Sequence, residues 1–411
     1  MVPARGAGSV LAVVDVFHVS AYRRLWASGF FLNVARWMDL VTLGWLALQL
    51  TGSPFMVGLA AFARSAPMML VGPFGGIVAD RVPRGRVLVL TQAIGGLTAA
   101  ALALAFATGG GSYATLVTLE IVFGALWAVD FPARRTALYA VLGAPRVARA
   151  VSLETVSMQI AKILGPLAAG FCLARIGPAG CFATIAFIYA VGLVLTTGIR
   201  RELGGPGRAP SASIFGSLRA GLGVAWRSAT VRSTLLATIA INVLFFPYQH
   251  MLPVFARDVL LVGPVVLGAL FAADGCGALA GALVIASHRG DFSHRALFAG
   301  AIVAGPLLLI ALSVSPSLAL CLGLLVLMGV AESAFAAMQS TLVLLGSPEH
   351  TRGGVMGILS ACIGTGPFGT LAIGSLAAAV GVSHAFTINA LVSLAVLFPL
   401  AVVLARPSAP C

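Results

Sequence analysis

ALFAGAIVAGPLLLIALSV, residues 296–314, is followed after two residues by SLALCLGLLVLMGVAESAFAAM, residues 317–338. Each run is apolar over nearly the roughly 20 helical residues that a hydrocarbon core about 30 Å thick requires. The runs lack the alternation of a membrane β-barrel strand, so their backbone groups must be hydrogen bonded within helices. The stretch therefore predicts two membrane helices joined by a tight turn.

The same apolar pattern fills nearly the whole 411-residue chain. Of its residues, 60% are hydrophobic and only 9% are charged, and the mean hydropathy is +1.05. A soluble protein of this length carries far more charge, so these values indicate a chain that has lipid as its solvent. We expect an all-α polytopic membrane protein with 12 transmembrane helices, over residues 24–50, 55–79, 87–108, 113–131, 155–176, 180–199, 231–255, 263–286, 296–314, 317–338, 355–379 and 384–404.

The net charge of +13 indicates topology and not a nucleic-acid partner, because the arginines gather in alternate loops. Cytoplasmic loops of membrane proteins carry the excess of basic residues, which places both termini in the cytoplasm. The richest of these loops, residues 200–230, contains the Gly-, Pro- and Ser-rich stretch ELGGPGRAPSAS and separates six expected helices from six. We therefore expect an N-terminal half (residues 1–199), a cytoplasmic linker (residues 200–230) and a C-terminal half (residues 231–411).

The loop GGIVADRVPRGR, residues 75–86, lies between the second and third expected helices. It resembles the signature loop of the major facilitator superfamily, although Pro83 stands at the usual second glycine and Gly85 at a basic position. The resemblance implies the major facilitator fold, alternating access, and a gating latch at the cytoplasmic side. In this latch Asp80 would face the eleventh helix and Arg84 would pair with Asp130; the alternative is that the charges only set topology. The expected latch residues are Gly76, Asp80, Arg81, Arg84 and Asp130.

A second motif lies in the fifth expected helix. AKILGPLAAG, residues 161–170, resembles the antiporter motif of drug exporters at Gly165, Pro166 and Gly170, with alanine at two glycine positions. Small residues there would allow close packing against the other half, and the alternative is a simple helix kink. Residues 130–166 resemble a bacterial branch that includes macrolide-efflux and enterobactin-exporter proteins. This resemblance implies a bacterial cytoplasmic (inner) membrane protein.

Charged side chains within the expected helices are candidates for coupling, because charge in hydrocarbon is costly and marks transport pathways. Arg36 and Asp39 are three residues apart in the first helix, so they can share one helix face and pair. Burial of Asp39 favours its protonated form and pairing favours its charged form, which makes it our first proton-coupling candidate. A permanent ion pair is the alternative. Asp274 and Glu332, which have no basic partner in their own helices, are the further candidates.

The expected substrate cavity includes polar and aromatic residues at the same depth. Around Pro247, the seventh helix carries a polar and aromatic cluster that is typical of an adaptable cavity wall, or else of lipid-facing aromatics at the outer interface. An aromatic wall with a lone acid would suit amphipathic or cationic substrates. The cavity candidates are Asn33, Trp37, Arg64, Glu120, Asn242, Phe246 and Gln249.

Motifs of nucleotide-dependent, zinc-dependent and serine enzymes do not stand out, and we expect neither an enzyme nor a cofactor or metal site. The expected function is proton-coupled efflux of amphipathic small molecules such as drugs or siderophore-like metabolites. The alternatives are a proton-coupled uptake symporter and a non-transporting receptor or assembly protein. The expected partners are a small-molecule substrate, protons and the lipid bilayer, with no nucleic acid, and we expect a monomer.

Overall fold

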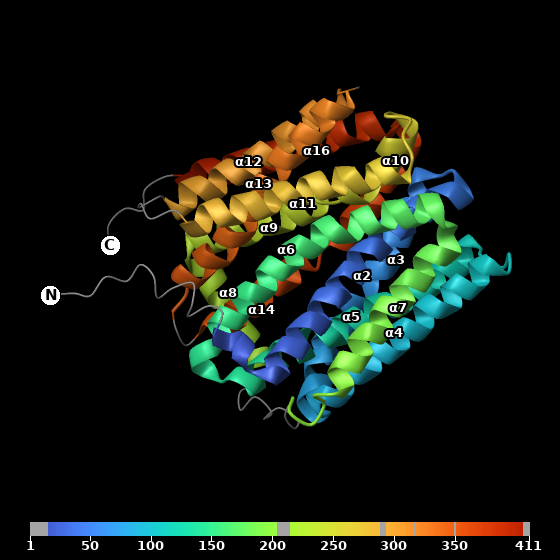
Figure 1. Ribbon diagram of the computed structural model, residues 1–411. Helices are drawn as coiled ribbons and strands as arrows, with labels where there is room; N and C mark the ends of the chain where they lie inside the picture. The colour runs from blue at the N-terminus through green and yellow to red at the C-terminus, as the bar shows by residue number, and fades with distance from the viewer. Residues whose placement is uncertain (1–14, 204–213, 288–292, 316, 349–350, 406–411) are drawn as a thin grey trace.

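The computed structural model describes residues 15–203, 214–287, 293–315, 317–348 and 351–405. Within these ranges only the backbone is described for residues 70–81, 144–145, 147–148, 214–218 and 220. Regular structure in the described chain is entirely helical. Figure 1 shows long helices running side by side, with both termini at one end of the molecule. We call this end the terminal end and the opposite end the distal end.

The first group of helices follows a short 3-10 helix, Asp15–His18. Its members alternate in direction and are joined by short turns, as the apolar runs predict. They are α2 (Ser20–Thr51), α3 (Pro54–Arg81), α4 (Arg84–Ala107), α5 (Tyr113–Leu142), α6 (Ala144–Arg175) and α7 (Gly177–Thr197).

The second group follows α8 (Ile214–Arg227), which lies within the expected linker. Two of its spanning segments consist of more than one element. The group contains α9 (Ala229–Ala240), the π-helix η2 (Ile241–Phe245), α10 (Tyr248–Asp258), α11 (Pro264–Ser287), α12 (His294–Ser313), α13 (Leu318–Leu345), α14 (Arg352–Ile363), α15 (Gly366–Val380) and α16 (Val382–Ala405).

Ten described segments are long and apolar enough to cross a membrane, with α9, η2 and α10 forming one segment and α14 and α15 another. The helices α2 and α3, with 32 and 28 residues, also have sufficient length. The prediction of an all-α polytopic fold is confirmed, and each expected helix has a counterpart. That α2 and α3 also cross the membrane, which would give 12 crossings, stays a prediction.

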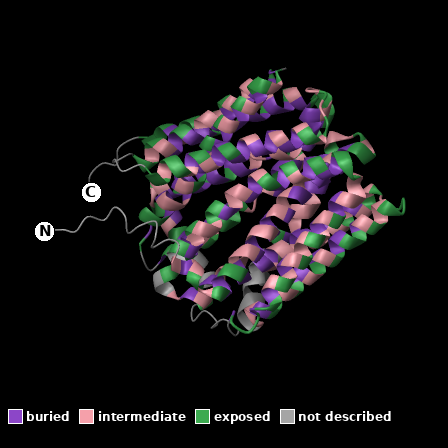
Figure 2. Cartoon of the chain, viewed as in Figure 1, coloured by how far each residue is buried: buried purple, intermediate pink, exposed green. Residues whose placement is uncertain are grey.

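The outer surface of the bundle is apolar. Leu97, Phe187 and Val194 are 70%, 68% and 71% exposed. Figure 2 shows exposed residues along the outward sides of the helices and buried residues between the helices. Large apolar side chains on an outer surface are stable in lipid and unfavourable in water, so this surface fits a protein embedded in a bilayer.

The ends of α5 and α6 differ from the expected boundaries at residues 131 and 155. Both helices continue through the basic segment that was expected to be a loop, to Leu142 and from Ala144. Ion pairs stabilise this extension, since Arg134 Nε lies 3.1 Å from Asp130 and Arg135 Nε lies 3.4 Å from Glu154. Hydropathy indicates which residues tolerate lipid, and a helix can continue beyond them into water.

Three prolines in expected helices have different effects. Gly366 and Pro367 begin α15 after a break that separates it from α14. Pro247 follows the π-helix η2 and precedes α10, which agrees with an irregular wall in the seventh helix. Pro166 lies inside α6, which continues through this position to Arg175.

The two groups of helices pack closely near the distal end. A Cβ atom on Gly170 of α6 would collide with the Pro264 carbonyl of α11, and one on Gly268 would collide with the Pro166 carbonyl. Gly58 of α3 similarly faces the carbonyl group of Thr370 in α15. In Figure 1, α6 and α11 approach each other toward the distal end and diverge toward the terminal end.

Candidate functional site

The first candidate site is an ion cluster within the first group of helices. Arg64 of α3 uses one nitrogen, Nη1, to contact both Asp39 Oδ2 of α2 and Glu120 Oε2 of α5, the latter at 2.9 Å. The side chains of Asp39 and Glu120 are 3% and 0% exposed. Their other oxygens, Oδ1 and Oε1, are buried without a hydrogen-bond partner among the described residues. One cation therefore balances two carboxylates in this cluster.

The expected pair of Arg36 and Asp39 is wrong, because Asp39 contacts Arg64 instead. The guanidinium carbon of Arg36 lies 3.4 Å from the centre of the Trp127 ring in α5. The three-residue spacing allowed a pair within α2, but α3 brings a guanidinium to the Asp39 side of that helix. Arg36 makes a cation–π contact with no ion pair among the described residues.

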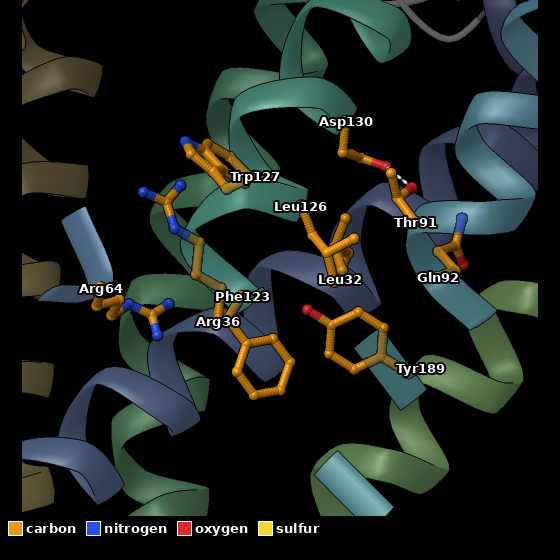
Figure 3. A pocket seen from close by; sticks show the side chains of 10 residues that line it. All are labelled: Leu32, Arg36, Arg64, Thr91, Gln92, Phe123, Leu126, Trp127, Asp130 and Tyr189. Atoms are coloured by element: carbon orange, nitrogen blue, oxygen red, sulfur yellow. Dashed lines mark hydrogen bonds between the residues drawn. The ribbon is translucent and has the colours of Figure 1, made fainter. Parts of the chain in front are cut away.

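A pocket with an empty volume of about 360 Å3 lies next to this cluster, between α2, α3, α4, α5 and α7. Figure 3 shows Arg36 and Arg64 on one side of it and the Tyr189 hydroxyl group pointing into it. The pocket is lined by Leu32, Arg36, Arg64, Thr91, Gln92, Phe123, Leu126, Trp127, Asp130 and Tyr189.

Asp130 lies at the pocket wall and is fully engaged. It accepts hydrogen bonds from Thr91 at 2.9 Å, the interaction dashed in Figure 3, and from Arg134 Nε at 3.1 Å. The expected pairing of Asp130 with Arg84 is therefore wrong in this structure, since Arg134, one helical turn away, already holds the carboxylate. The Arg84 Nε atom has no hydrogen-bond partner among the described residues. For Gly76, Asp80 and Arg81 only the backbone is described, so the structure does not test their part in the expected latch.

The second candidate site is an ion cluster between the two groups of helices. Lys162 Nζ of α6 lies 2.8 Å from Asp274 Oδ2 of α11 and 2.8 Å from Glu332 Oε2 of α13. The Lys162 and Asp274 side chains are each 1% exposed, whereas that of Glu332 is 25% exposed. Gln249 of α10 donates a hydrogen bond to Glu332 Oε2 at 3.1 Å, and the Tyr248 hydroxyl lies 3.4 Å from Asp274 Oδ1.

This interface cluster unites two of the predicted coupling residues, Asp274 and Glu332, with the cavity candidate Gln249. Sequence reasoning recognised that both acids lack a basic partner in their own helices, but it missed the partner that another helix supplies. Lys162 is the only lysine in the sequence and lies inside an expected membrane helix. A lysine in that setting is a signal for a buried counter-charge.

The remaining cavity candidates have different surroundings. The Asn33 amide donates to the Gly29 carbonyl within α2, and the Asn242 amide in η2 donates to the Thr238 carbonyl of α9, both at 2.9 Å. Trp37 lies near the interface cluster, with its ring centre 5.5 Å from Lys162 Nζ. Phe246 packs edge-on against Phe335.

Two expectations about the helix surfaces are also corrected. The aromatic residues near Pro247 are not all lipid-facing, because Phe245 and Tyr248 are 3% and 1% exposed. Gly165 packs closely, but against α2, with the position of its missing Cβ 2.6 Å from Trp37 Cβ. Two other residues of this motif approach the other group of helices, Pro166 at Gly268 and Gly170 at Pro264.

Comparisons with known proteins agree with this architecture. The transmembrane secretion effector family of the major facilitator superfamily matches residues 13–408. The multidrug efflux pump Tap of Mycolicibacterium fortuitum is 26% identical over 358 residues, which cover 85% of this chain and 87% of Tap. The staphyloferrin A transporter of Staphylococcus aureus is 26% identical over 170 residues, or 41% of this chain and 43% of that protein.

Solved structures share the fold at low sequence identity. A bacterial homologue of the human lysosomal transporter Spinster, in an inward-facing and unoccupied conformation, superposes with a TM-score of 0.74 at 14% identity, covering 95% of this chain and 98% of that one. The nucleoside transporter NupG superposes with a TM-score of 0.72 at 16% identity, covering 94% and 100%. The chain therefore belongs to the transmembrane secretion effector family of the major facilitator superfamily, and it is a membrane transporter of small molecules and not an enzyme.

Proposed function

We propose that this protein exports amphipathic small molecules from a bacterial cell in exchange for protons. It would act as a monomer in the cytoplasmic membrane, with residues 1–199 and 231–411 as the two moving halves. The relative named as a multidrug efflux pump supports export, and the relative named as a staphyloferrin A transporter supports a small-molecule substrate. Alternating access is the mechanism that this fold supports.

The orientation of the protein follows from its basic residues. Arg23, Arg146 and Arg227 are exposed on elements at the terminal end, so we take this end to face the cytoplasm. The glycine contacts between α6 and α11 and between α3 and α15 then close the outer side. In this arrangement a substrate would enter the pocket from the cytoplasm.

The single observation that carries proton coupling is the interface cluster. Lys162 belongs to one proposed half, and both of its acids belong to the other. Two carboxylates facing one ammonium group leave an excess negative charge, which one proton would neutralise. Movement of α6 away from α11 would take Lys162 from its acids, and an unpaired buried charge is strongly unfavourable. Protonation of Asp274 or Glu332 would therefore be linked to the movement that opens the outer side.

Transport in inverted membrane vesicles tests this proposal. The vesicle interior is acidified, and a pH-gradient dye is followed during addition of lipophilic cations, macrolides, catecholate siderophores and naphthalene carboxylates. We expect at least one compound to dissipate the gradient in wild-type vesicles but not with Asp274→Asn or Glu332→Gln. Asp258→Asn is the matched control, because Asp258 forms an exposed ion pair with Arg257. Unchanged coupling in both interface variants would exclude these acids as the proton site, and substrate movement only in the opposite direction would favour uptake.

A further inference from the structure

Arg36 differs from the other cations in the middle of the bundle. Arg64, Arg134 and Lys162 each contact at least one carboxylate, whereas Arg36 has no acid within ion-pair distance among the described residues. It lies on α2 beside the pocket, and its guanidinium group covers the face of Trp127 (Figure 3). An aromatic face attracts a cation but has no net charge, so this contact compensates the guanidinium only in part.

The acids around the pocket are already occupied. Asp130 is bound by Arg134 and Thr91, and Asp39 and Glu120 both contact Arg64. If one of these acids moved toward Arg36, Arg64 or Arg134 would lose a carboxylate that now balances its charge. A group that neutralises Arg36 without weakening these pairs would therefore come from outside the described protein.

The walls of the pocket indicate what such a molecule looks like. Phe123, Leu126 and Leu32 provide an apolar surface, and Phe123 stacks at a tilt on Tyr189 with ring centres 5.8 Å apart. The Tyr189 hydroxyl points into the pocket and makes no hydrogen bond among the described residues, so it is available as a further donor. The planar guanidinium group of Arg36 matches a carboxylate, and Tyr189 adds a hydroxyl donor to the lining of the same pocket.

We infer that Arg36 and Trp127 form a subsite for a carboxylate group of the transported molecule, with the aromatic and aliphatic wall holding its apolar part. This inference rests on the proposed export function and specifies its substrate class as amphipathic acids. It narrows the expected amphipathic or cationic substrates to amphipathic acids, because the acids that would favour cations are paired in the structure and Arg36 has no acid partner among the described residues.

Equilibrium binding to the purified full-length protein in phosphatidylcholine nanodiscs tests the subsite without a proton gradient. The probes are 1-naphthylacetate and its neutral analogue 1-naphthylacetamide, which differ mainly in charge. We expect the carboxylate to bind about 10- to 100-fold more tightly, as a charge-assisted hydrogen bond provides. Arg36→Gln should abolish this preference, and Arg36→Lys should retain part of it. The matched control is Arg175→Gln, since Arg175 also lies over an aromatic ring, that of Phe171, but is exposed outside the pocket.

Several outcomes would overturn the inference. The first is that the wild-type protein binds the acid and the amide with equal affinity. The second is that the carboxylate does not bind at millimolar concentration. The third is that folded Arg36→Gln prefers the carboxylate as strongly as the wild-type protein does. Displacement of the carboxylate by added phosphatidylglycerol would assign the subsite to a lipid headgroup instead. Because no gradient is present, failure of proton-coupled export leaves this binding result unaffected, and a negative binding result leaves export untouched.

Discussion

Replacement of Lys162 by methionine should expose the charge imbalance of the interface cluster. Methionine preserves an apolar stem of similar length but removes the ammonium group, which lies 2.8 Å from both Asp274 and Glu332. Asp274 is 1% exposed, so water cannot substitute for the lost partner. Removal of one partner from a buried ion pair costs about 3–5 kcal/mol. We expect Lys162→Met to lower the free energy of unfolding by about this amount at pH 8.

Denaturant unfolding of the purified protein in mixed micelles measures this loss. Arg146→Met is the matched control, because Arg146 pairs with Asp15 at 3.8 Å with both side chains nearly half exposed, and such pairs contribute at most about 1 kcal/mol. The triple variant Lys162→Met, Asp274→Asn, Glu332→Gln should recover most of the loss at pH 8. A deficit no larger than that of Arg146→Met, or one that removal of both acids does not relieve, would refute the reasoning.

Three further variants address packing, gating and coupling. Gly268→Leu should reduce transport by at least about tenfold, because the new leucine side chain would collide with the Pro166 carbonyl. Gly300→Leu is the control: the space around its Cβ is open, so this variant should remain active in the same vesicle assay. Asp80→Asn should slow transport without lowering the amount of protein in the membrane, and loss of the protein from the membrane would count against a latch. Asp39→Asn should change substrate affinity but preserve proton coupling, whereas loss of coupling would return Asp39 to the first place among the proton candidates.

The positions of the helices could be predicted because lipid imposes a simple requirement on length and composition. The first expected helix, residues 24–50, corresponds to α2 at Ser20–Thr51, and the last, residues 384–404, corresponds to α16 at Val382–Ala405. Boundaries failed where a helix continued into water, as at the end of α5. The helix α8 also escaped prediction, because the Gly- and Pro-rich residues before it dominate the composition of the linker.

The partners of charged residues could be predicted much less well. Asp39 has a cation three residues earlier in its own helix, yet it contacts Arg64 from the next helix. Such pairings depend on how each helix is rotated about its axis. Hydropathy contains little information on this rotation when the lipid-facing and protein-facing sides of a helix are both apolar. The close approach of Gly165 to α2 was assigned to the wrong neighbour for the same reason.

The two ion clusters have the same balance of charges, but their positions in the bundle give them different roles. Each has one cation and two carboxylates, but the Arg64 cluster lies wholly within the first group of helices, while the Lys162 cluster joins the first group to the second. Rigid movement of the two groups leaves the contacts of Arg64 intact and must alter those of Lys162. A proton that binds the Arg64 cluster changes the electric field near Arg36 in the pocket. A proton that binds the Lys162 cluster changes the relative free energies of the two conformations. Coupling to a gradient requires the latter, which is why Asp274 and Glu332 rank above Asp39 as proton carriers.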